Sequence, residues 1–249
     1  MIGRRGFIVA ISMTVLFGGA ASAGDGGVLV FGGNRATGLE VVKALAAKGE
    51  KVAVFVRPTS DIAELKKLNV ATITGDAMNA EDVKKAIASS KFRAVVSSLG
   101  GRRGEPRPDY EGTKNIVDGA KAAGVKRMVI VTAIGTGDSV KAVSEQTIKV
   151  LGPVYAEKVR GEDYLKNSGL TYTIIRPGGL RNEPPTGNGM LTEDITVGGD
   201  INRSDLGQLT ATAIDDTKAF NKVYSAVDKN KVAAVPMVPR QELTNPVQK

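Results

Sequence analysis

Residues 28–42 read Val-Leu-Val-Phe-Gly-Gly-Asn-Arg-Ala-Thr-Gly-Leu-Glu-Val-Val, and this stretch decides the fold. The apolar run 28–31 predicts a short buried strand, and Gly32 begins a glycine turn. The stretch 39–48 then predicts a helix. Strand, glycine turn and helix in this order are the first unit of a doubly wound parallel sheet, so we predict an α/β protein.

The glycine turn has the spacing of a dinucleotide-binding turn, with one departure. Gly32 and Gly38 are the first and third glycines of a G-x-x-G-x-x-G pattern, and Arg35 stands at the middle position. Gly32 allows a tight turn, and Gly38 allows the helix to pack closely on the strand. The free N–H groups at the start of the helix attract phosphate. An ordinary tight turn without a ligand is the alternative interpretation.

Length and composition bound the chemistry. The 249 residues suffice for one large α/β domain, and they include no Cys, His or Trp. A disulfide, a thiol nucleophile, a zinc–thiolate site and an imidazole base are therefore excluded. No spaced carboxylate cluster suggests a metal site, so we predict none. Acid–base chemistry would fall to Tyr, Lys, Asp, Glu or the hydroxyl groups.

The formal net charge is +8, with basic residues scattered along the chain. Aromatic residues make up only 4% of the chain, whereas nucleic-acid binding favours a basic stripe with interleaved aromatics. We therefore expect no nucleic-acid partner. A basic surface suits an anionic small ligand such as a dinucleotide, although a solvated basic surface is the simpler interpretation.

Residues 1–23 have the pattern of an export signal. Arg4 and Arg5 supply a positive start, 7–17 is an apolar run too short for a comfortable membrane span, and Ala-Ser-Ala at 21–23 is a cleavage site. The paired arginines suggest the twin-arginine route, and a general secretory signal or an ordinary first element is the alternative. We expect an exported, bacterial periplasmic protein without a membrane segment after cleavage.

The rest of the chain alternates strands and helices. Solid apolar strands indicate a parallel sheet covered on both faces, hence a single domain over 24–228 with an extended tail over 229–249. Stretches 100–108 and 181–190 are predicted loops. Further strands are predicted at 51–57, 70–74, 94–100, 126–132, 170–176, 195–201 and 222–227, and helices at 61–68, 80–89, 110–123, 153–167 and 204–214.

Cofactor preference follows from the end of the second predicted strand. Sites that prefer NAD usually have Asp or Glu there, on the ribose 2′-hydroxyl. This chain has Arg57, with no acid beside it, and Arg35 in the glycine turn can reach the same phosphate. A guanidinium fork matches a 2′-phosphate, which favours NADP(H) over NAD(H). Taken singly, each arginine could be an ordinary surface charge.

A second group of residues is Tyr155-Ala-Glu-Lys158, whose ends share one helix face. A lysine beside the nicotinamide ribose can bond its hydroxyls and lower the pKa of a nearby phenol. Tyr155 could then donate a proton as hydride arrives. Alternatively, Tyr155 packs in the core and Lys158 is a surface charge. Glu162, one turn further on, could pair with Lys158.

Several motifs together resemble a known family. They are Gly-Gly-Asn-Arg-Ala-Thr-Gly at 32–38, Val-Arg-Pro at 56–58, Gly-Asp at 75–76, Ser-Ser-Leu-Gly at 97–100, and Leu-Lys-Asn-Ser-Gly-Leu-Thr-Tyr-Thr-Ile-Ile-Arg-Pro-Gly-Gly-Leu at 165–180. The chain resembles the atypical short-chain dehydrogenase/reductases, in particular the NmrA-like and biliverdin reductase B-like NAD(P)H-binding proteins. The match covers about 28–227. It implies a Rossmann-type doubly wound sheet.

The resemblance also implies roles for individual residues. The catalytic candidates are Tyr155, Lys158 and Thr132, although Tyr155 precedes Lys158 by three residues rather than four, and Thr132-Ala133 occupies the usual position of the active serine. The implied function is reduction of a small planar acceptor (quinone, flavin, tetrapyrrole or carbonyl) with NADP(H), or else non-catalytic NADP(H) binding or redox sensing. The implied cofactor-binding residues are Gly32, Asn34, Arg35, Ala36, Thr37, Gly38, Arg57, Asp76, Ala77, Ser97, Ser98, Leu99, Gly100, Thr132, Lys158, Pro177, Gly178 and Gly179.

Overall fold

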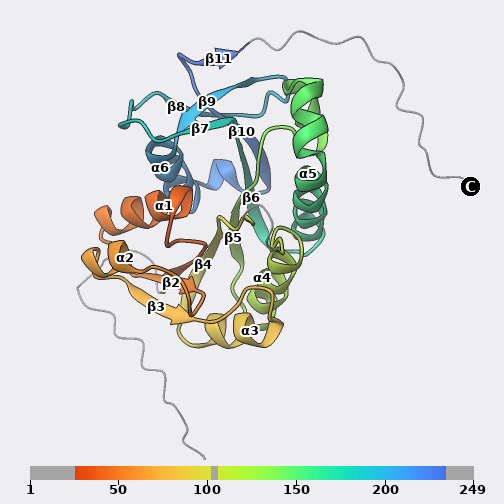
Figure 1. Cartoon of the computed structure of the whole chain (residues 1–249). Helices are drawn as coiled ribbons and strands as arrows, with labels where there is room; N and C mark the ends of the chain where they lie inside the picture. The colour runs from red at the N-terminus through yellow and green to blue at the C-terminus, as the bar shows by residue number, and fades with distance from the viewer. Residues whose placement is uncertain (1–25, 102–105, 234–249) are drawn as a thin grey trace, which may run out of the picture.

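The computed structural model describes residues 26–101 and 106–233 and is built on one eight-stranded sheet (Figure 1). All neighbouring strands are parallel except the last pair, β10 and β8. This confirms the predicted α/β class with a doubly wound sheet. In spatial order the strands are β3 (Ala71–Thr74), β2 (Val52–Val56), β1 (Gly27–Phe31), β4 (Phe92–Ser97), β5 (Arg127–Val131), β6 (Thr171–Pro177), β10 (Lys222–Asp228) and β8 (Gly189–Thr192).

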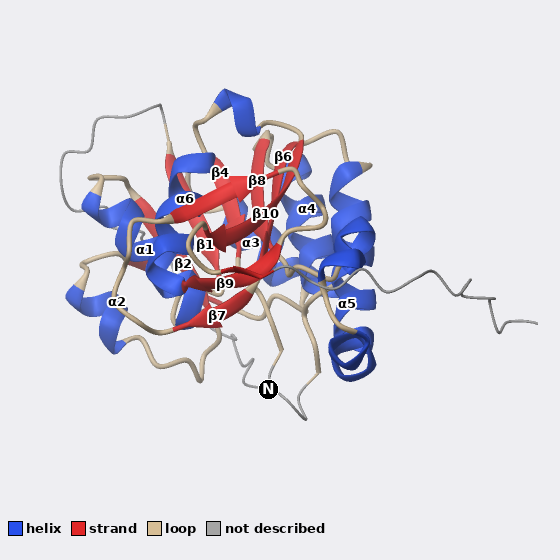
Figure 2. Ribbon diagram, turned by 90° about the horizontal axis from the view of Figure 1, so that it is seen from above, coloured by secondary structure: helices blue, strands red, loops and turns tan. Residues whose placement is uncertain are grey.

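Helices cover both faces of this sheet, as Figure 2 shows. One side has α1 (Ala36–Ala47), α2 (Ala63–Lys67) and α6 (Arg203–Ala213). The other has α3 (Ala80–Ala88), α4 (Glu111–Ala122) and α5 (Glu145–Lys166). Short 3₁₀ turns, η1 (Gly137–Ala142) and η2 (Thr217–Ala219), follow β5 and α6. Every strand of the sheet centre is therefore buried between two helical layers.

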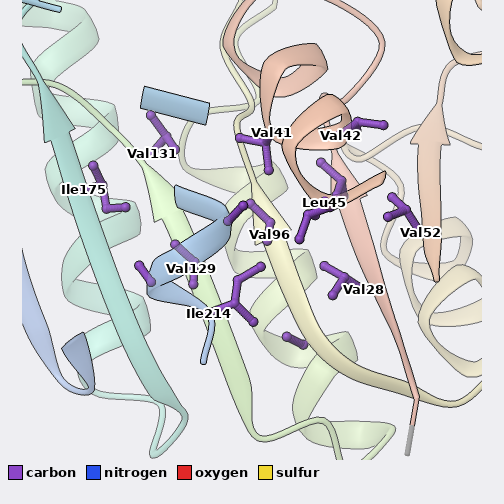
Figure 3. Packing of buried hydrophobic residues seen from close by; sticks show 14 of the residues in the cluster. Val28, Val41, Val42, Leu45, Val52, Val96, Val129, Val131, Ile175 and Ile214 are labelled. Carbon is purple, nitrogen blue, oxygen red and sulfur yellow. The ribbon is translucent and has the colours of Figure 1, made fainter. Parts of the chain in front are cut away.

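The two-sided cover explains why the central strands are apolar throughout. Successive side chains of a strand point to opposite faces. Val28 of β1 packs with the α1 residues Val41 and Leu45 (Figure 3). Leu29 and Phe31 belong to the core of the opposite face. Because neither face meets water, no polar alternation is needed, and the sequence shows none.

The region after β6 is more regular than predicted. The predicted loop 181–190 instead contains the end of β7 (Gly179–Arg181) and the start of β8, and the predicted strand 195–201 begins later, as β9 (Gly198–Asn202). A second sheet has the order β11–β9–β7, with β11 (Val232–Ala233) inside the predicted tail. These short strands exist because distant partners pair with them, which local patterns do not reveal.

Two helices begin at other residues than the sequence predicts. The helix predicted at 153–167 begins eight residues earlier, since α5 starts at Glu145 and includes Pro153. Its cap is Ser144, whose Oγ accepts from Thr147 N at 3.2 Å. The helix predicted at 204–214 likewise begins one residue earlier, since α6 starts at Arg203.

Two predictions fall on other parts of the chain. The export signal at 1–23 and the tail beyond 233 lie outside the described residues. Within the described ranges, no helix is both long and apolar enough to cross a membrane.

Candidate dinucleotide-binding site

The site lies at the carboxyl ends of the central strands, where the strand order reverses. From β1 the chain builds outward to β2 and β3, then returns to place β4 on the other side of β1. Such a switch point leaves a crevice outside the strand ends, where open α/β sheets bind ligands.

The glycine turn after β1 is sterically demanding. Gly32 has φ +77°, and a Cβ there would lie 2.8 Å from the carbonyl oxygen of Ser98. A Cβ on Gly38 would lie 2.1 Å from the carbonyl oxygen of Gly32. The structure therefore confirms the tight turn predicted at Gly32 and the close approach of the helix predicted at Gly38. Ala36, the first residue of α1, has φ +48°, a left-handed conformation uncommon outside glycine.

The same turn contains an unsatisfied hydroxyl. Thr37 is 5% exposed, and its Oγ1 is buried with no hydrogen-bond partner among the described residues. Buried polar atoms without partners are rare, and they recur at ligand sites. An anion at the start of α1 would meet free backbone N–H groups as well as this hydroxyl. The turn therefore fits a phosphate group.

Arg35 and Arg57 both extend from this edge of the sheet. Nη2 of Arg35 donates to the carbonyl oxygen of Gly100 at 3.2 Å, so Arg35 connects the glycine turn to the loop after β4. Arg57 directly follows β2, is exposed, and its backbone N–H donates to Ser60 Oγ at 3.1 Å. Since β1 and β2 are paired neighbours, the two arginines follow adjacent strand ends.

One acid lies closer to the turn than the sequence indicates. Asn34 Nδ2 donates to the backbone oxygen of Asp61 at 3.3 Å. The Asp61 carboxylate accepts from Ala63 N at 2.9 Å, at the start of α2. The nearest carboxylate in the β2–α2 loop is thus engaged in a helix start.

The remaining predicted adenosine-side residues follow β3 and β4. Asp76 Oδ1 accepts from Met78 N at 2.9 Å, and buried Asn115 donates to Ala77 O at 2.9 Å. Ser98 N donates to the Phe31 carbonyl oxygen at 3.0 Å, which holds the β4 end against the β1 end. Ser97 is buried, whereas Leu99 and Gly100 are partly exposed beside the turn. The structure brings these residues to one edge.

Thr132, directly after β5, joins a buried polar network that the sequence analysis missed. Its Oγ1 donates to Glu162 Oε1 at 2.7 Å. Glu162 is fully buried and pairs with Arg176, which is 2% exposed, through Nη2 to Oε2 at 2.6 Å. Arg176 also pairs with Asp138. The contacts of Glu162 and Asp138 raise the pKa of Arg176 against the opposing effect of burial. A lone charge in an apolar strand, as at Arg176, is the signal that could have found this network.

Tyr155 and Lys158 have different surroundings from those predicted. Lys158 Nζ lies 2.7 Å from Oδ1 of buried Asp109, so its expected pairing with Glu162 was wrong. Tyr155 is 8% exposed and packs against Gly135, where a Cβ would lie 2.6 Å from the ring. Burial raises the pKa of the Tyr155 phenol, whereas a lysine contact was expected to lower it.

The Pro-Gly-Gly segment at the end of β6 has a packing role of its own. A Cβ on Gly178 would lie 2.0 Å from the Gly199 carbonyl oxygen, and one on Gly179 would lie 2.0 Å from Asp200 Oδ1. Pro177 O accepts from Ile134 N at 2.8 Å, which ties this segment to the one after Thr132. These glycines are therefore required by the approach of β9, with or without a ligand.

Among the residues that the structure describes, no three His, Cys, Asp or Glu side chains are grouped so that they could hold a metal ion. A polar hollow of about 320 Å³ adjoins β6 and β10 and includes none of the predicted cofactor residues. It is lined by Asp138, Arg176, Glu193, Ile195, Asn221, Lys222, Val223 and Ser225.

The fold and the phosphate-fitting turn define an α/β protein of the Rossmann, dinucleotide-binding class. The sequence model of the NAD(P)H-binding family matches residues 32–217, and the chain belongs to that family. The resemblance to atypical short-chain dehydrogenase/reductases is thereby confirmed. The fold is that of an NAD(P)H-binding oxidoreductase.

Individual relatives agree with this assignment. An uncharacterised chloroplastic protein of Arabidopsis thaliana, At2g34460, is 28% identical over 80% of this chain and 76% of its own. The solved structure of ChuY, an anaerobilin reductase from Escherichia coli O157:H7, is similar with a TM-score of 0.74 and 28% identity, covering 82% of this chain and 97% of ChuY. A short-chain dehydrogenase/reductase of Veillonella parvula in complex with NADP has a TM-score of 0.67 and 16% identity, over 86% and 99% of the chains, and shares the fold.

Proposed function

We propose that this protein is an NADP(H)-dependent reductase that passes hydride to a small planar acceptor. One observation carries the choice of cofactor: Arg35 and Arg57 follow adjacent strand ends, and the nearby carboxylate of Asp61 is engaged at the start of α2. A guanidinium can hold a 2′-phosphate by two parallel hydrogen bonds, whereas a carboxylate would repel it.

The chain offers a residue for each part of the cofactor. Backbone N–H groups of the turn 32–38, with Thr37 Oγ1, would hold the pyrophosphate. Arg35 and Arg57 would hold the 2′-phosphate. Asp76 and Ala77 would lie at the adenine, and 97–100 at the ribose. Thr132, Lys158 and the segment 177–179 would line the nicotinamide, which supplies the hydride when bound.

The structural relative ChuY, an anaerobilin reductase, supports the reductase class. Acceptor choice in this fold depends on the segments around the nicotinamide, and these vary freely between relatives. We propose only a planar, conjugated acceptor: a quinone, a flavin, a tetrapyrrole or a carbonyl compound.

The deciding experiment has two stages. The nucleotide content of the purified protein is measured first, together with affinities for NADPH and NADH at one salt concentration. NADPH oxidation is then followed with a panel of quinones, flavins, a linear tetrapyrrole and aldehydes. We expect tighter binding of NADPH and turnover with at least one acceptor. Equal affinity for both cofactors would contradict the cofactor proposal.

A non-catalytic NADP(H)-binding or redox-sensing protein is the second candidate. The contacts of the two expected proton-transfer residues favour it: Lys158 is paired with Asp109, and Tyr155 is buried against Gly135. Tight NADPH binding without turnover on the whole panel would select this candidate.

We also propose that residues 1–23 are an export signal, that 24–228 form the NAD(P)-binding Rossmann domain, and that 229–249 include an extended tail. The basis is the sequence pattern of 1–23 alone. Export by the twin-arginine route would allow the cofactor to be bound in the cytoplasm first.

A further inference from the structure

Three donors converge on one oxygen of a buried carboxylate beneath the nicotinamide side of the proposed site. Oε1 of Glu162 accepts from Thr132 Oγ1 at 2.7 Å, Thr136 Oγ1 at 2.8 Å and Arg176 Nε at 3.2 Å. Oε2 accepts from Arg176 Nη2 at 2.6 Å. Glu162 and Thr136 are fully buried and Arg176 is 2% exposed, so these three side chains meet one another in the protein interior.

The arrangement decides which way the hydroxyl protons point. A carboxylate that faces a guanidinium across two hydrogen bonds is ionised and can only accept. Both threonines must therefore act as donors toward Glu162 or another acceptor. Thr136 has a second acceptor, the Ala133 carbonyl oxygen, at 2.8 Å. The Thr132 hydroxyl donates to Glu162, and a hydroxyl has only one proton, so the Thr132 oxygen has only lone pairs left to offer.

Exposure separates the two threonines. Thr132 is partly exposed at the end of β5, whereas Thr136 is wholly buried. Thr132 is also one of the residues proposed to line the nicotinamide. A ligand in the site can therefore meet the Thr132 oxygen and cannot meet that of Thr136.

Resting on the proposed function, we propose that Glu162 is a positioning residue that makes Thr132 a hydrogen-bond acceptor only. Thr132 then accepts from the carboxamide N–H of the nicotinamide, and it does not donate to the carbonyl oxygen of an acceptor substrate. This differs from the role expected of a hydroxyl at the active-serine position. It also gives a reason to keep a buried ion pair, since apolar residues of similar volume are often as stable.

The test compares two ligands that differ in that N–H alone. NADP⁺ carries a carboxamide, and its 3-acetylpyridine analogue carries a methyl group in place of the amide nitrogen. Calorimetric titration of the full chain is expected to show the analogue binding about 10-fold more weakly, the effect of one lost hydrogen bond. In Thr132→Val, the ratio of the affinity for NADP⁺ to the affinity for the analogue should fall by about 5-fold or more. Thr132→Ser, which keeps the hydroxyl, should retain it.

Thr136→Val is the matched control. It removes a hydroxyl that contacts the same Glu162 oxygen, but Thr136 is buried and does not face the site. It should keep the wild-type ratio. In Glu162→Gln, the side-chain amide can donate to the Thr132 oxygen, which frees the Thr132 hydroxyl proton for another acceptor. The ratio of the two affinities in this variant should therefore fall toward that of Thr132→Val. Circular dichroism establishes that each variant is folded, and if Glu162→Gln is not, the two threonine variants still decide the polarity.

The outcomes separate this inference from the proposed function. A wild type that binds both ligands equally, or a Thr132→Val ratio equal to that of the wild type, overturns the inference. A wild-type ratio in folded Glu162→Gln removes Glu162 from it. A wild type that binds neither ligand contradicts the proposed cofactor instead.

Discussion

At the residue scale, the proposed specificity depends on a few side chains whose neighbours are now known. Arg57 directly follows β2, and Arg35 reaches the Gly100 carbonyl from the glycine turn. To bind a 2′-phosphate there, the Arg35 guanidinium would exchange the neutral Gly100 carbonyl for an anion that can accept two hydrogen bonds. The anion is the stronger partner. Both arginines are therefore expected to contribute to cofactor discrimination, and replacing both should weaken NADPH binding more than replacing either alone.

Arg57→Ala should weaken NADPH binding by about 10- to 150-fold, the equivalent of roughly 1.5–3 kcal/mol for a charge-assisted hydrogen bond. NADH affinity should change little, because NADH has no 2′-phosphate. Arg57→Lys, which keeps the charge but not the fork, should give an intermediate value. Fluorescence titration at fixed salt measures all three proteins. Parallel losses for NADPH and NADH would show that Arg57 acts on the fold instead.

Tyr155→Phe tests the proposed proton donor. If Tyr155 donates a proton, the variant should lose turnover by about 100-fold while NADPH affinity stays nearly unchanged. Because burial raises the pKa of the phenol above its usual value near 10, Tyr155 should remain protonated throughout the neutral range. The wild-type rate should therefore show no ionisation of this group below about pH 10. Unchanged turnover in the variant would assign the proton to water.

At the element scale, the close crossing of α1 over the end of β1 holds the phosphate turn in place. A Cβ on Gly38 would meet backbone rather than a flexible side chain, so the helix would have to move. The start of α6 is also held in place, because the Asp205 carboxylate accepts hydrogen bonds from backbone N–H groups in the loop between β7 and β8. Both elements should therefore be sensitive to single-atom changes.

Gly38→Ala should lower the free energy of unfolding by about 1–3 kcal/mol, the usual cost of overpacking, and should abolish tight NADPH binding. Gly152→Ala is its control, because Gly152 lies in α5 with open space around it. That variant should be neutral or slightly stabilised, since alanine favours helix. Urea denaturation measures both. A fully stable Gly38→Ala protein would contradict the close approach.

Asp205→Asn should destabilise the protein by about 1–3 kcal/mol at pH 7. Although burial opposes it, hydrogen bonds from Thr186 and Gly187 lower the pKa of this carboxyl. A lowered pKa means that the carboxylate stabilises the fold above its unfolded pKa of about 3.8 and loses this effect as pH falls through the lower folded value. The difference in melting temperature between wild type and variant should be constant from pH 5 to 8 and shrink below pH 3.8. Glu81→Gln, at an exposed position of α3, is the control.

At the scale of the whole molecule, the described chain is one doubly wound sheet with an added small sheet (Figure 1). The strand order places the turn, both arginines and Thr132 along one sheet edge, although they lie up to a hundred residues apart in sequence. The proposed export also concerns the whole chain, because the first strand that the structure describes begins at Gly27, after the proposed signal segment 1–23. A segment ahead of the first strand can be removed without loss of any described strand.

Cleavage after Ala23 should give a mature protein that begins at Gly24. Intact-mass spectrometry of periplasmic protein from the native cell measures this, with whole-cell protein as the reference. Replacing Arg4 and Arg5 by lysine should block export by the twin-arginine route and spare general secretion. A pool retaining Met1 and found only in the cytoplasm would contradict the export proposal.

The sequence by itself determined the first unit of the sheet and, through it, the fold class. The strand, the glycines and the helix of 28–48 are neighbours in the chain, so their pattern of apolar residues and glycines predicts their conformation directly. The ends of the second and third strands were also predicted to within one residue, and with them the positions of Arg57 and Asp76, whereas β4 ends at Ser97 rather than at the predicted residue 100. These residues reach one edge because parallel strands place their carboxyl ends together.

Only the tertiary structure decided the partners of the charged groups. Glu162 pairs with Arg176, 14 residues away in the chain, and accepts a hydrogen bond from Thr132, 30 residues away. Lys158 of α5 pairs with Asp109, which lies in the turn before α4. The strands β7, β9 and β11 are stabilised by pairing with one another, and they are too short to show a sequence pattern of their own. Side-chain pairing between distant segments depends on how helices and strands pack, and local periodicity contains no information about that packing.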